Sequence, residues 1–248
     1  MELLFYSFLA VLIVSLISFV GVFTLGIGPE KLRKIILYII GFSTGALFGD
    51  VFLHLFPEMI KESPFTITTS FCILSGILAF FIMEKIIHWQ HCHMPITKQH
   101  IHPFAYTIII GDALHNIVDG MIIAASFIVN VPLGIATTLA VVFHEIPQEI
   151  GDFGILIHAG FSKKKALFIN FLAALTAFIG MFIAFFLNGT ISGIQGFFIP
   201  FTIGSFIYIA GSDLIPEMHK ETDLKKSVLQ ILFFIAGIMV MLALKLFG

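Results

Sequence analysis

The chain has 248 residues, of which 58% are hydrophobic and only 11% are charged. Soluble globular domains carry about 25% charged residues, so this composition excludes a single water-soluble core. Its apolar runs are about 20 residues long and continuous rather than alternating, which predicts membrane-spanning helices and argues against a β-barrel. The net charge of −2 carries no nucleic-acid signal, and we expect no nucleic-acid partner.

Loop signals divide the chain into eight predicted membrane helices, which form a single domain over residues 1–248. The first apolar run follows Met1-Glu2 directly, with no basic segment or cleavage site before it, so we expect a membrane helix there rather than a signal peptide. In chain order the predicted helices cover residues 3–25, 34–57, 65–87, 103–128, 132–158, 164–187, 194–218 and 227–247.

Lys and Arg are distributed very unequally between the two sides of this layout. Eleven of the 13 fall in or beside the connections after predicted helices 1, 3, 5 and 7, which leaves only Lys61 and Lys245 on the other side. The positive-inside rule then predicts that both termini are extracytoplasmic. We expect a multi-pass protein of the plasma (inner) membrane, and the lack of a long extracellular domain favours a prokaryotic one.

A short string occurs near the ends of the second and seventh helices. Pro57-Glu58-Met59-Ile60-Lys61-Glu62 and Pro216-Glu217-Met218-His219-Lys220-Glu221 differ at one position. The predicted topology places one copy at the outer end of its helix and the other at the inner end. The string therefore predicts an inverted repeat that relates helices 1–3 to helices 6–8.

The fourth and fifth helices carry polar clusters in their middle. His115 and His144 each lie twelve residues after a proline that begins the helix, about 18 Å along the axis and near the bilayer midplane. Helical spacing puts the polar residues of each helix on one stripe. These residues are Asp112, His115, Asn116 and Asp119 on the fourth helix, and His144, Glu145, Gln148, Glu149 and Asp152 on the fifth.

Ionisable groups at bilayer depth are costly, so they indicate an ion or substrate path. Imidazole, carboxylate and amide groups together are typical ligands of a divalent transition metal. Pro147 donates no backbone hydrogen bond, so it frees the carbonyl of Phe143 and is expected to kink the helix. The alternative, polar groups that only bond across a helix interface, would account for one or two such residues more readily than for nine.

Two other classes of protein compete with a transporter. The segment that begins with His144-Glu145 resembles the start of the HExxH motif of zinc hydrolases. Gln148 occupies the position of the second His of that motif, and Pro147 interrupts the helix between them. Both departures disfavour an enzyme. A metal-selective channel is the other rival. Metal flux into liposomes separates the three, because an enzyme gives none and a channel gives flux without saturation.

These residues resemble the ZIP (Zrt/Irt-like) metal transporters, in particular the LIV-1-like branch. His115-Asn116-x-x-Asp119-Gly120 matches the fourth-helix motif HNxxDG. The segment from His144 to Phe153 matches the fifth-helix motif HEΦPHEΦGDF, where Φ is apolar, at every position except Gln148. Further matches are Gly49-Asp50-x-x-x-His54-x-x-Pro57-Glu58 in the second helix and Asp213-x-x-Pro216-Glu217 in the seventh.

The resemblance implies a 3+2+3 arrangement of eight helices, with a two-metal site between helices 4 and 5. It assigns His115, Asp119, His144 and Gln148 to one metal. It assigns Asn116, Asp119, Glu145 and Gln148 to the second, with Asp119 as the bridge. Gln148 stands where many relatives have His, which weakens the implied ligand set.

Two further groups are candidate sites. The first is a pathway formed by Asp50, His54, Asp112, Glu149, Asp152, Asp213 and Glu217. The second is a cytoplasmic loop over residues 88–102, whose ligands would be His88, His91, Cys92, His93, His100 and His102. Such a His-rich loop can bind zinc loosely, although a polar connector with incidental His is the simpler alternative.

The sequence therefore predicts a secondary transporter that takes a divalent transition metal into the cytoplasm. Zinc is the first candidate, and Fe²⁺, Mn²⁺ and Cd²⁺ accept similar ligands. We expect the metal to be the transported substrate, with no prosthetic group. The expected partners are the metal and the lipid bilayer, with a homodimer as the oligomeric state to test.

Overall fold

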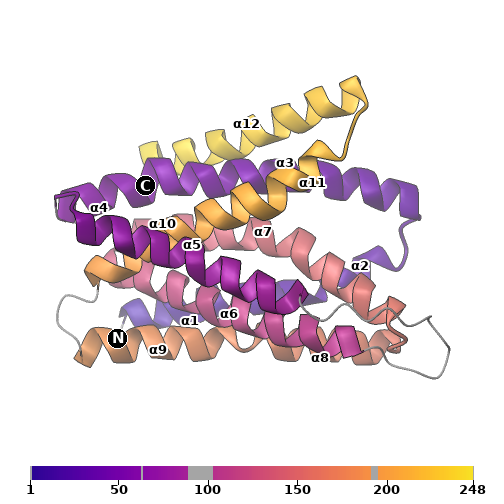
Figure 1. Ribbon diagram of the computed structural model, residues 1–248, viewed down its shortest axis with the longest axis horizontal. Helices are drawn as coiled ribbons and strands as arrows, with labels where there is room; N and C mark the ends of the chain where they lie inside the picture. The colour runs from indigo at the N-terminus through magenta and orange to yellow at the C-terminus, as the bar shows by residue number, and fades with distance from the viewer. Residues whose placement is uncertain (1, 63, 89–102, 191–194, 248) are drawn as a thin grey trace.

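The computed structural model describes residues 2–62, 64–88, 103–190 and 195–247, and its described elements are all helical (Figure 1). The α-helices are α1 (Glu2–Ile17), α2 (Gly21–Thr24), α3 (Pro29–Asp50), α4 (Phe56–Glu62), α5 (Ile67–His88), α6 (Pro103–Val129), α7 (Val131–His158), α8 (Lys163–Ala174), α9 (Ala177–Thr190), α10 (Gln195–Tyr208), α11 (Ile215–His219) and α12 (Leu224–Phe247). Three short turns join some of them: the 3₁₀ turn η1 (Ser18–Val20) and the π-helical turns η2 (Val51–Leu55) and η3 (Ile209–Leu214).

Within the described part of the chain, seven helical stretches are long and apolar enough to cross a membrane. Several of the short elements run on into one another, so that α8 with α9 and α10 with η3 and α11 each make one such stretch. The 28-residue helix α7 has spanning length as well, and like α6 it carries polar residues in its middle. The predicted all-α polytopic membrane fold is confirmed.

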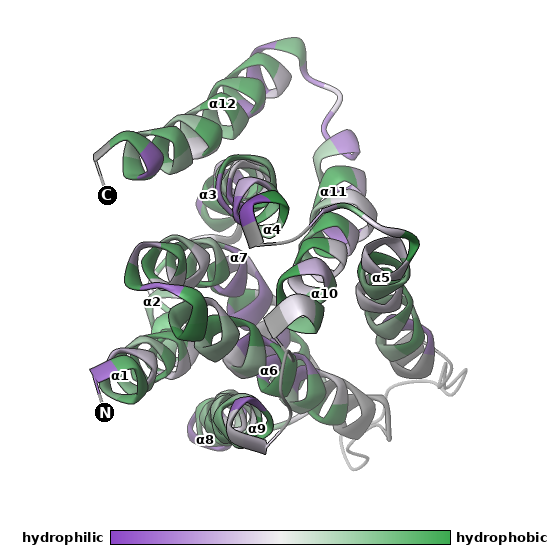
Figure 2. Cartoon of the chain, turned by 90° about the vertical axis from the view of Figure 1, so that its left-hand side faces the viewer, coloured by the Kyte–Doolittle hydropathy of each residue, from purple (hydrophilic) through white to green (hydrophobic). Residues whose placement is uncertain are grey.

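The helices α6 and α7 occupy the middle of the bundle (Figure 2). In the most apolar stretch of α6, 67% of the residues are buried within the protein. The corresponding share is 11% in α5 and 17% in α12. α6 packs against α7 and α9, whereas α7 packs against α1 and α3. The two helices that carry the polar clusters are therefore shielded by the others.

The outer helix pair α3–α12 is held together by a very close backbone approach. A Cβ atom added at Gly45 would collide with the backbone of Phe234, and one added at Gly237 would collide with the backbone of Phe42. Small residues permit such an approach in a membrane, where packing rather than the hydrophobic effect drives helix association. Glycine is therefore required at both positions.

The pair α5–α10 repeats this contact. A Cβ atom at Gly204 would meet the backbone of Ile73, and one at Gly76 would meet the backbone of Phe201. In each helix of both pairs, the glycine follows its contacted residue by three positions. The two helix pairs thus pack in the same way. In this comparison α10 corresponds to α3, and α5 corresponds to α12.

Further features of α3 and α10 support the inverted repeat. Each helix widens into a π-helical turn, η2 or η3, that ends two residues before a proline, Pro57 or Pro216. Gly45 precedes Pro57 by as many residues as Gly204 precedes Pro216. In Figure 1 the two helices run in opposite directions. Proline cannot donate the helical hydrogen bond, which explains a locally altered turn at the same place in both.

Candidate metal site

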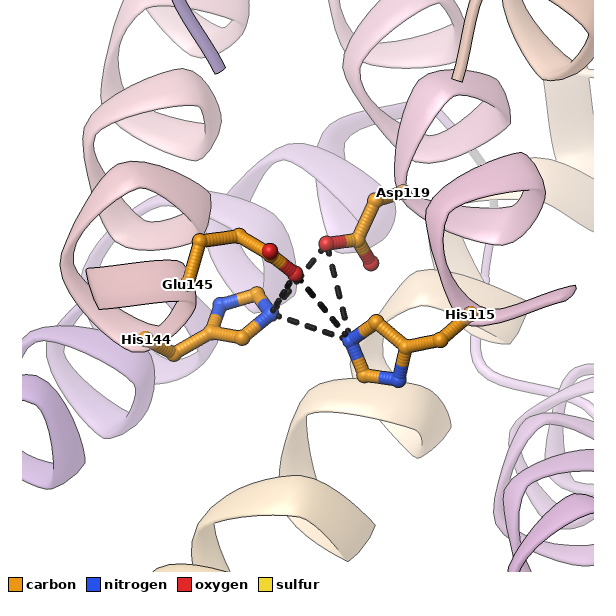
Figure 3. A group of neighbouring side chains, drawn as sticks. All are labelled: His115, Asp119, His144 and Glu145. Carbon is orange, nitrogen blue, oxygen red and sulfur yellow. Dashed lines mark hydrogen bonds and ion pairs between the residues drawn. The ribbon is translucent and has the colours of Figure 1, made fainter. Parts of the chain in front are cut away.

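Four side chains from the two central helices converge on one point (Figure 3). His115 and Asp119 lie one turn apart on α6, and His144 and Glu145 are neighbours on α7. One ligand atom from each lies within 4.8 Å of the other three, and all four residues are buried. We call this group the four-ligand cluster.

The distances within the four-ligand cluster suit a small tetrahedral cation. His144 Nε2 lies 3.1 Å from Asp119 Oδ2 and 3.6 Å from Glu145 Oε1. His115 Nε2 lies 3.3 Å from His144 Nε2, 3.5 Å from Glu145 Oε1 and 3.7 Å from Asp119 Oδ2. Zn²⁺ with bonds of about 2.0–2.2 Å keeps tetrahedral ligand atoms roughly 3.3–3.5 Å apart. Five of the six separations among the two imidazole nitrogens and two carboxylate oxygens are therefore close to those that zinc requires, and the sixth is below 4.8 Å.

The carboxylates of the four-ligand cluster are left without ordinary donors. Both side-chain oxygens of Asp119 and of Glu145 are buried and accept no hydrogen bond from the residues that the structure describes. Buried carboxylates are costly unless they are paired or coordinate a metal. This pattern points to a bound cation rather than to a purely structural network.

Neighbouring groups orient the two imidazoles. His144 Nδ1 lies 3.2 Å from the carbonyl oxygen of Ala140, which leaves Nε2 facing the cluster. The ring of Phe80 packs edge-on against His115, and that of Phe206 packs in the same way against His144. The bond to the Ala140 carbonyl fixes the ligating nitrogen of His144, and the two aromatic contacts restrict the orientation of both rings.

The proline of α7 has a specific partner on α3. Pro147 lies within α7 and cannot bond to the carbonyl of Phe143, the residue before His144. That carbonyl instead accepts a hydrogen bond at 2.5 Å from the hydroxyl of Ser43, which also lies 2.8 Å from the carbonyl of Ile39 in its own helix. The backbone next to the cluster is thereby fastened to α3.

Two more hydrogen bonds join the same helices. The hydroxyl of Thr137 on α7 donates to Asp50 Oδ2 at 3.1 Å, and the amide of Asn130 donates to Glu58 Oε1 at 2.9 Å. The other side-chain atom of Asn130, Oδ1, accepts from the Leu133 amide at 2.8 Å and so caps α7. Together with the Ser43 contact, these bonds make three polar contacts that join α3 and α4 to α7 and to the residue that caps it.

The two amide residues predicted as ligands meet a third polar group. Asn116 Nδ2 donates to Asp112 Oδ1 at 2.9 Å and to the Asp112 carbonyl at 3.0 Å. Gln148 Nε2 lies 3.4 Å from the same Asp112 Oδ1. Glu145, which the resemblance assigned to the second metal, lies beside the two imidazoles together with Asp119.

Asp50 and His54, the predicted pathway residues of α3 and η2, are both buried. His54 Nδ1 lies 3.4 Å from Asp50 Oδ1. His54 also borders a cavity of about 230 Å³ whose wall includes Glu58 and Asn130. The cavity lies beside α4 and the start of α7, with His54 but not Asp50 in its wall.

The remaining pathway candidates are dispersed. Glu149 is fully buried, and its carboxylate accepts a hydrogen bond from the amide of Asn170 on α8. Asp152 on α7 and Asp213 in η3 are half-buried, whereas Glu217 on α11 is exposed and pairs with Lys220. None of these joins the four-ligand cluster among the residues that the structure describes.

The predicted loop ligands cannot be placed. His91, Cys92, His93, His100 and His102 lie outside the described residues. His88 is the last residue of α5, and its side chain lies outside the described part as well.

Sequence reasoning missed Ser43, Thr137 and Asn170, which hold the backbone or the acids of the site. Each is a polar residue within an apolar membrane helix, and that is the signal that could have drawn attention to them. Their partners lie on helices far away in the sequence, so the pairing itself was not readable.

Comparison with known proteins gives a consistent result. The family described as "ZIP Zinc transporter" matches residues 90–245 of the chain. The Zinc transporter ZIP13 of Pongo abelii is 33% identical over 224 residues, which cover 84% of this chain and 66% of that protein.

Two further relatives are similar over most of the chain. The Zinc transporter zipt-7.2 of Caenorhabditis elegans is 30% identical, with 86% of this chain and 58% of that protein covered. The Zinc transporter YKE4 of Saccharomyces cerevisiae is also 30% identical, with 82% of this chain and 69% of that protein covered. The chain thus spans between 58% and 69% of the length of these three relatives.

Proposed function

Since the chain belongs to the ZIP zinc transporter family, we propose that it carries a divalent transition metal across a membrane, with zinc as the main cargo. The observation that carries the proposal is the four-ligand cluster. It combines two imidazoles and two carboxylates at tetrahedral spacing in the middle of a membrane-spanning bundle.

The choice of zinc rests on the chemistry of these ligands. Zn²⁺ accepts mixed nitrogen and oxygen ligands in a tetrahedral geometry, whereas Mg²⁺ and Ca²⁺ prefer six or more oxygens. The relatives ZIP13, zipt-7.2 and YKE4 are described as zinc transporters. Fe²⁺, Mn²⁺ and Cd²⁺ are secondary candidates because they accept similar ligands.

A second metal beside the first is part of the proposal. It would use Asn116, Asp119, Glu145 and Gln148, with Asp119 as the bridge. In support, Asp119 offers Oδ2 to the imidazoles and keeps Oδ1 free, and the side-chain oxygen of Asn116 is buried without a donor from the described residues.

The orientation that we propose for the chain rests on its charge distribution. Eleven of the 13 Lys and Arg lie on one side of the predicted topology, so we assign that side to the cytoplasm and propose uptake into it. The plasma membrane location and the extracytoplasmic termini belong to the same proposal. On this assignment the cavity beside His54 opens outward and would be the entrance.

The geometry speaks against the hydrolase alternative. A catalytic zinc site keeps a coordination position for water or substrate. Here four protein groups already complete a tetrahedral set. A closed set of this kind suits a site that holds the cation itself as cargo.

Flux into liposomes that contain the purified protein and a trapped zinc-sensitive dye tests the proposal. Saturable Zn²⁺ uptake is expected for the parent protein. His115→Ala and Asp119→Ala should abolish it, while Lys163→Ala, an exposed residue at the start of α8, should leave it intact. Uptake that does not saturate would indicate a channel, and unchanged uptake by either site variant would refute the site.

A further inference from the structure

Asp112 is buried on α6, one turn before His115, and it lies outside the four-ligand cluster. A buried carboxylate needs hydrogen-bond donors. Two donors are the side-chain amides of Asn116 and Gln148, which both point their NH₂ groups at the Oδ1 atom of Asp112. These amides are the two amide ligands of the proposed second metal.

The orientation of the Asn116 amide is fixed by more than the carboxylate. Its Nδ2 atom also lies 3.0 Å from the backbone carbonyl of Asp112, which can only accept a hydrogen bond. The NH₂ end must therefore face Asp112. As a result, the Oδ1 atom of Asn116 is turned away, buried, and without a donor from the described residues.

The Gln148 amide reaches Asp112 from the other central helix. Its Nε2 atom lies 3.4 Å from Asp112 Oδ1, so one carboxylate oxygen holds amides from both α6 and α7. The NH₂ group of an amide can only donate hydrogen bonds and does not bind a cation, whereas its oxygen can. Because the NH₂ group is held by its hydrogen bond to Asp112, the oxygen is the end of the amide that can face a metal.

We propose that Asp112 is a positioning residue that holds Asn116 and Gln148 by their NH₂ groups and so presents their oxygen atoms to the cargo metal. This inference rests on the proposed function of the site. Asp112 acts through the two amides and does not itself bind the ion. It thereby gives the second metal two amide oxygens beside the carboxylates of Asp119 and Glu145.

The same carboxylate would serve a histidine at position 148. An imidazole placed there could donate one ring N–H to Asp112 and offer the other nitrogen to the metal, which is the common carboxylate–histidine–zinc arrangement. Asp112 therefore orients either type of side chain. This separates its role from that of a charge on the ion path.

Zn²⁺ binding to the purified full chain in detergent, measured by calorimetry, tests the inference. Asp112→Leu, which cannot accept a hydrogen bond, should weaken binding about 10- to 100-fold, as is usual for groups that orient metal ligands. Asp112→Asn keeps an oxygen acceptor and should stay within about threefold of the parent, because hydrogen bonding rather than charge is required. Ser126→Ala is the matched control, since among the described residues that buried hydroxyl of α6 bonds only within its own helix, to the carbonyl of Ile122.

A second measurement addresses the mechanism directly. If Asp112 acts through Gln148, then Asp112→Ala should weaken binding much less in a Gln148→Ala background than in the parent, a non-additivity typical of residues that act together. Co²⁺ absorption should change with Asp112→Ala and stay parental with Asp112→Asn. Asp112→Ala takes the place of Asp112→Leu if the larger side chain prevents folding.

The outcomes are distinct. A parent protein that binds no Zn²⁺ would refute the proposed function itself. A parent that binds, together with parental affinity in Asp112→Ala and Asp112→Leu, would refute the role of Asp112 alone. Equal losses in Asp112→Asn and Asp112→Ala would show that the charge of Asp112 matters and would also overturn the inference.

Discussion

The hydroxyl of Ser43 on α3 lies 2.5 Å from the carbonyl of Phe143 on α7, exactly the carbonyl that Pro147 deprives of its helical partner. In a bilayer no water is at hand to satisfy such a group. The hydrogen bond therefore makes the proline tolerable and anchors the residue that precedes His144.

Ser43→Ala should consequently destabilise the protein. The buried carbonyl of Phe143 would lose its donor, at a cost of about 1–3 kcal/mol. Thermal unfolding in detergent measures the change. Ser7→Ala provides the comparison, because the hydroxyl of Ser7 bonds a carbonyl within its own helix, that of Leu3, at 2.8 Å. An equal effect of both substitutions would contradict a special role for Ser43.

Glu145→Gln is expected to impair zinc binding severely. It replaces an anionic oxygen that lies 3.5 and 3.6 Å from the two imidazole nitrogens. The loss should exceed the roughly 10- to 100-fold effect of groups that merely orient ligands. Calorimetry with Zn²⁺ gives the affinity.

Glu149→Gln, one turn further along α7, is the comparison for that experiment. The Glu149 carboxylate is bound by Asn170 and lies outside the four-ligand cluster, so Zn²⁺ affinity should remain near that of the parent. If Glu149→Gln weakens binding as much as Glu145→Gln, the metal lies elsewhere on α7.

Gln148→His should tighten metal binding. An imidazole is a stronger zinc ligand than a neutral amide, and Asp112 is already in place to accept the N–H of the ring nitrogen that does not bind the metal. Because a carrier must also release its ion, we expect a lower half-saturating concentration together with a lower maximal rate in liposomes. Unchanged affinity would mean that the residue at position 148 does not bind the metal.

Substitution of the mirrored glycines should produce matching defects. Gly45→Ala and Gly204→Ala each place a methyl group against a backbone, that of Phe234 or of Ile73, and both should lower the unfolding temperature. Gly154→Ala in α7 meets no atom within 4 Å and should be neutral or stabilising by about 0.5–1 kcal/mol, as alanine favours helix. If only one of Gly45→Ala and Gly204→Ala lowers the unfolding temperature, the two helix pairs α3–α12 and α5–α10 are not packed alike.

Much of the fold could be predicted from the sequence because membrane helices are recognisable by their length and hydropathy. The all-α polytopic fold and the resemblance to the ZIP family are confirmed. The repeated string at Pro57 and Pro216 indicated the relation between the halves, which the glycine contacts of α3 and α10 now support. The π-helical turns before these prolines were not foreseen, since hydropathy has no signal for a widened turn.

The site was less fully predictable. Helical spacing put His115 and Asp119 on one stripe and His144 and Glu145 near another, and the structure brings these four together. Spacing could not say how far α7 is rotated about its axis, which decides how closely Glu145 approaches the two imidazoles. That rotation depends on contacts such as Ser43 with Phe143, between residues a hundred positions apart.

The mirrored glycine contacts have a consequence for how the chain is inserted. If α3–α12 and α5–α10 are the same contact turned upside down, the packed interior fits a bilayer equally well in either sense. Up and down must then be decided elsewhere, and the lysines and arginines at the helix ends are the available asymmetry. A few relocated positive charges could invert the whole molecule without disturbing a single contact in its interior.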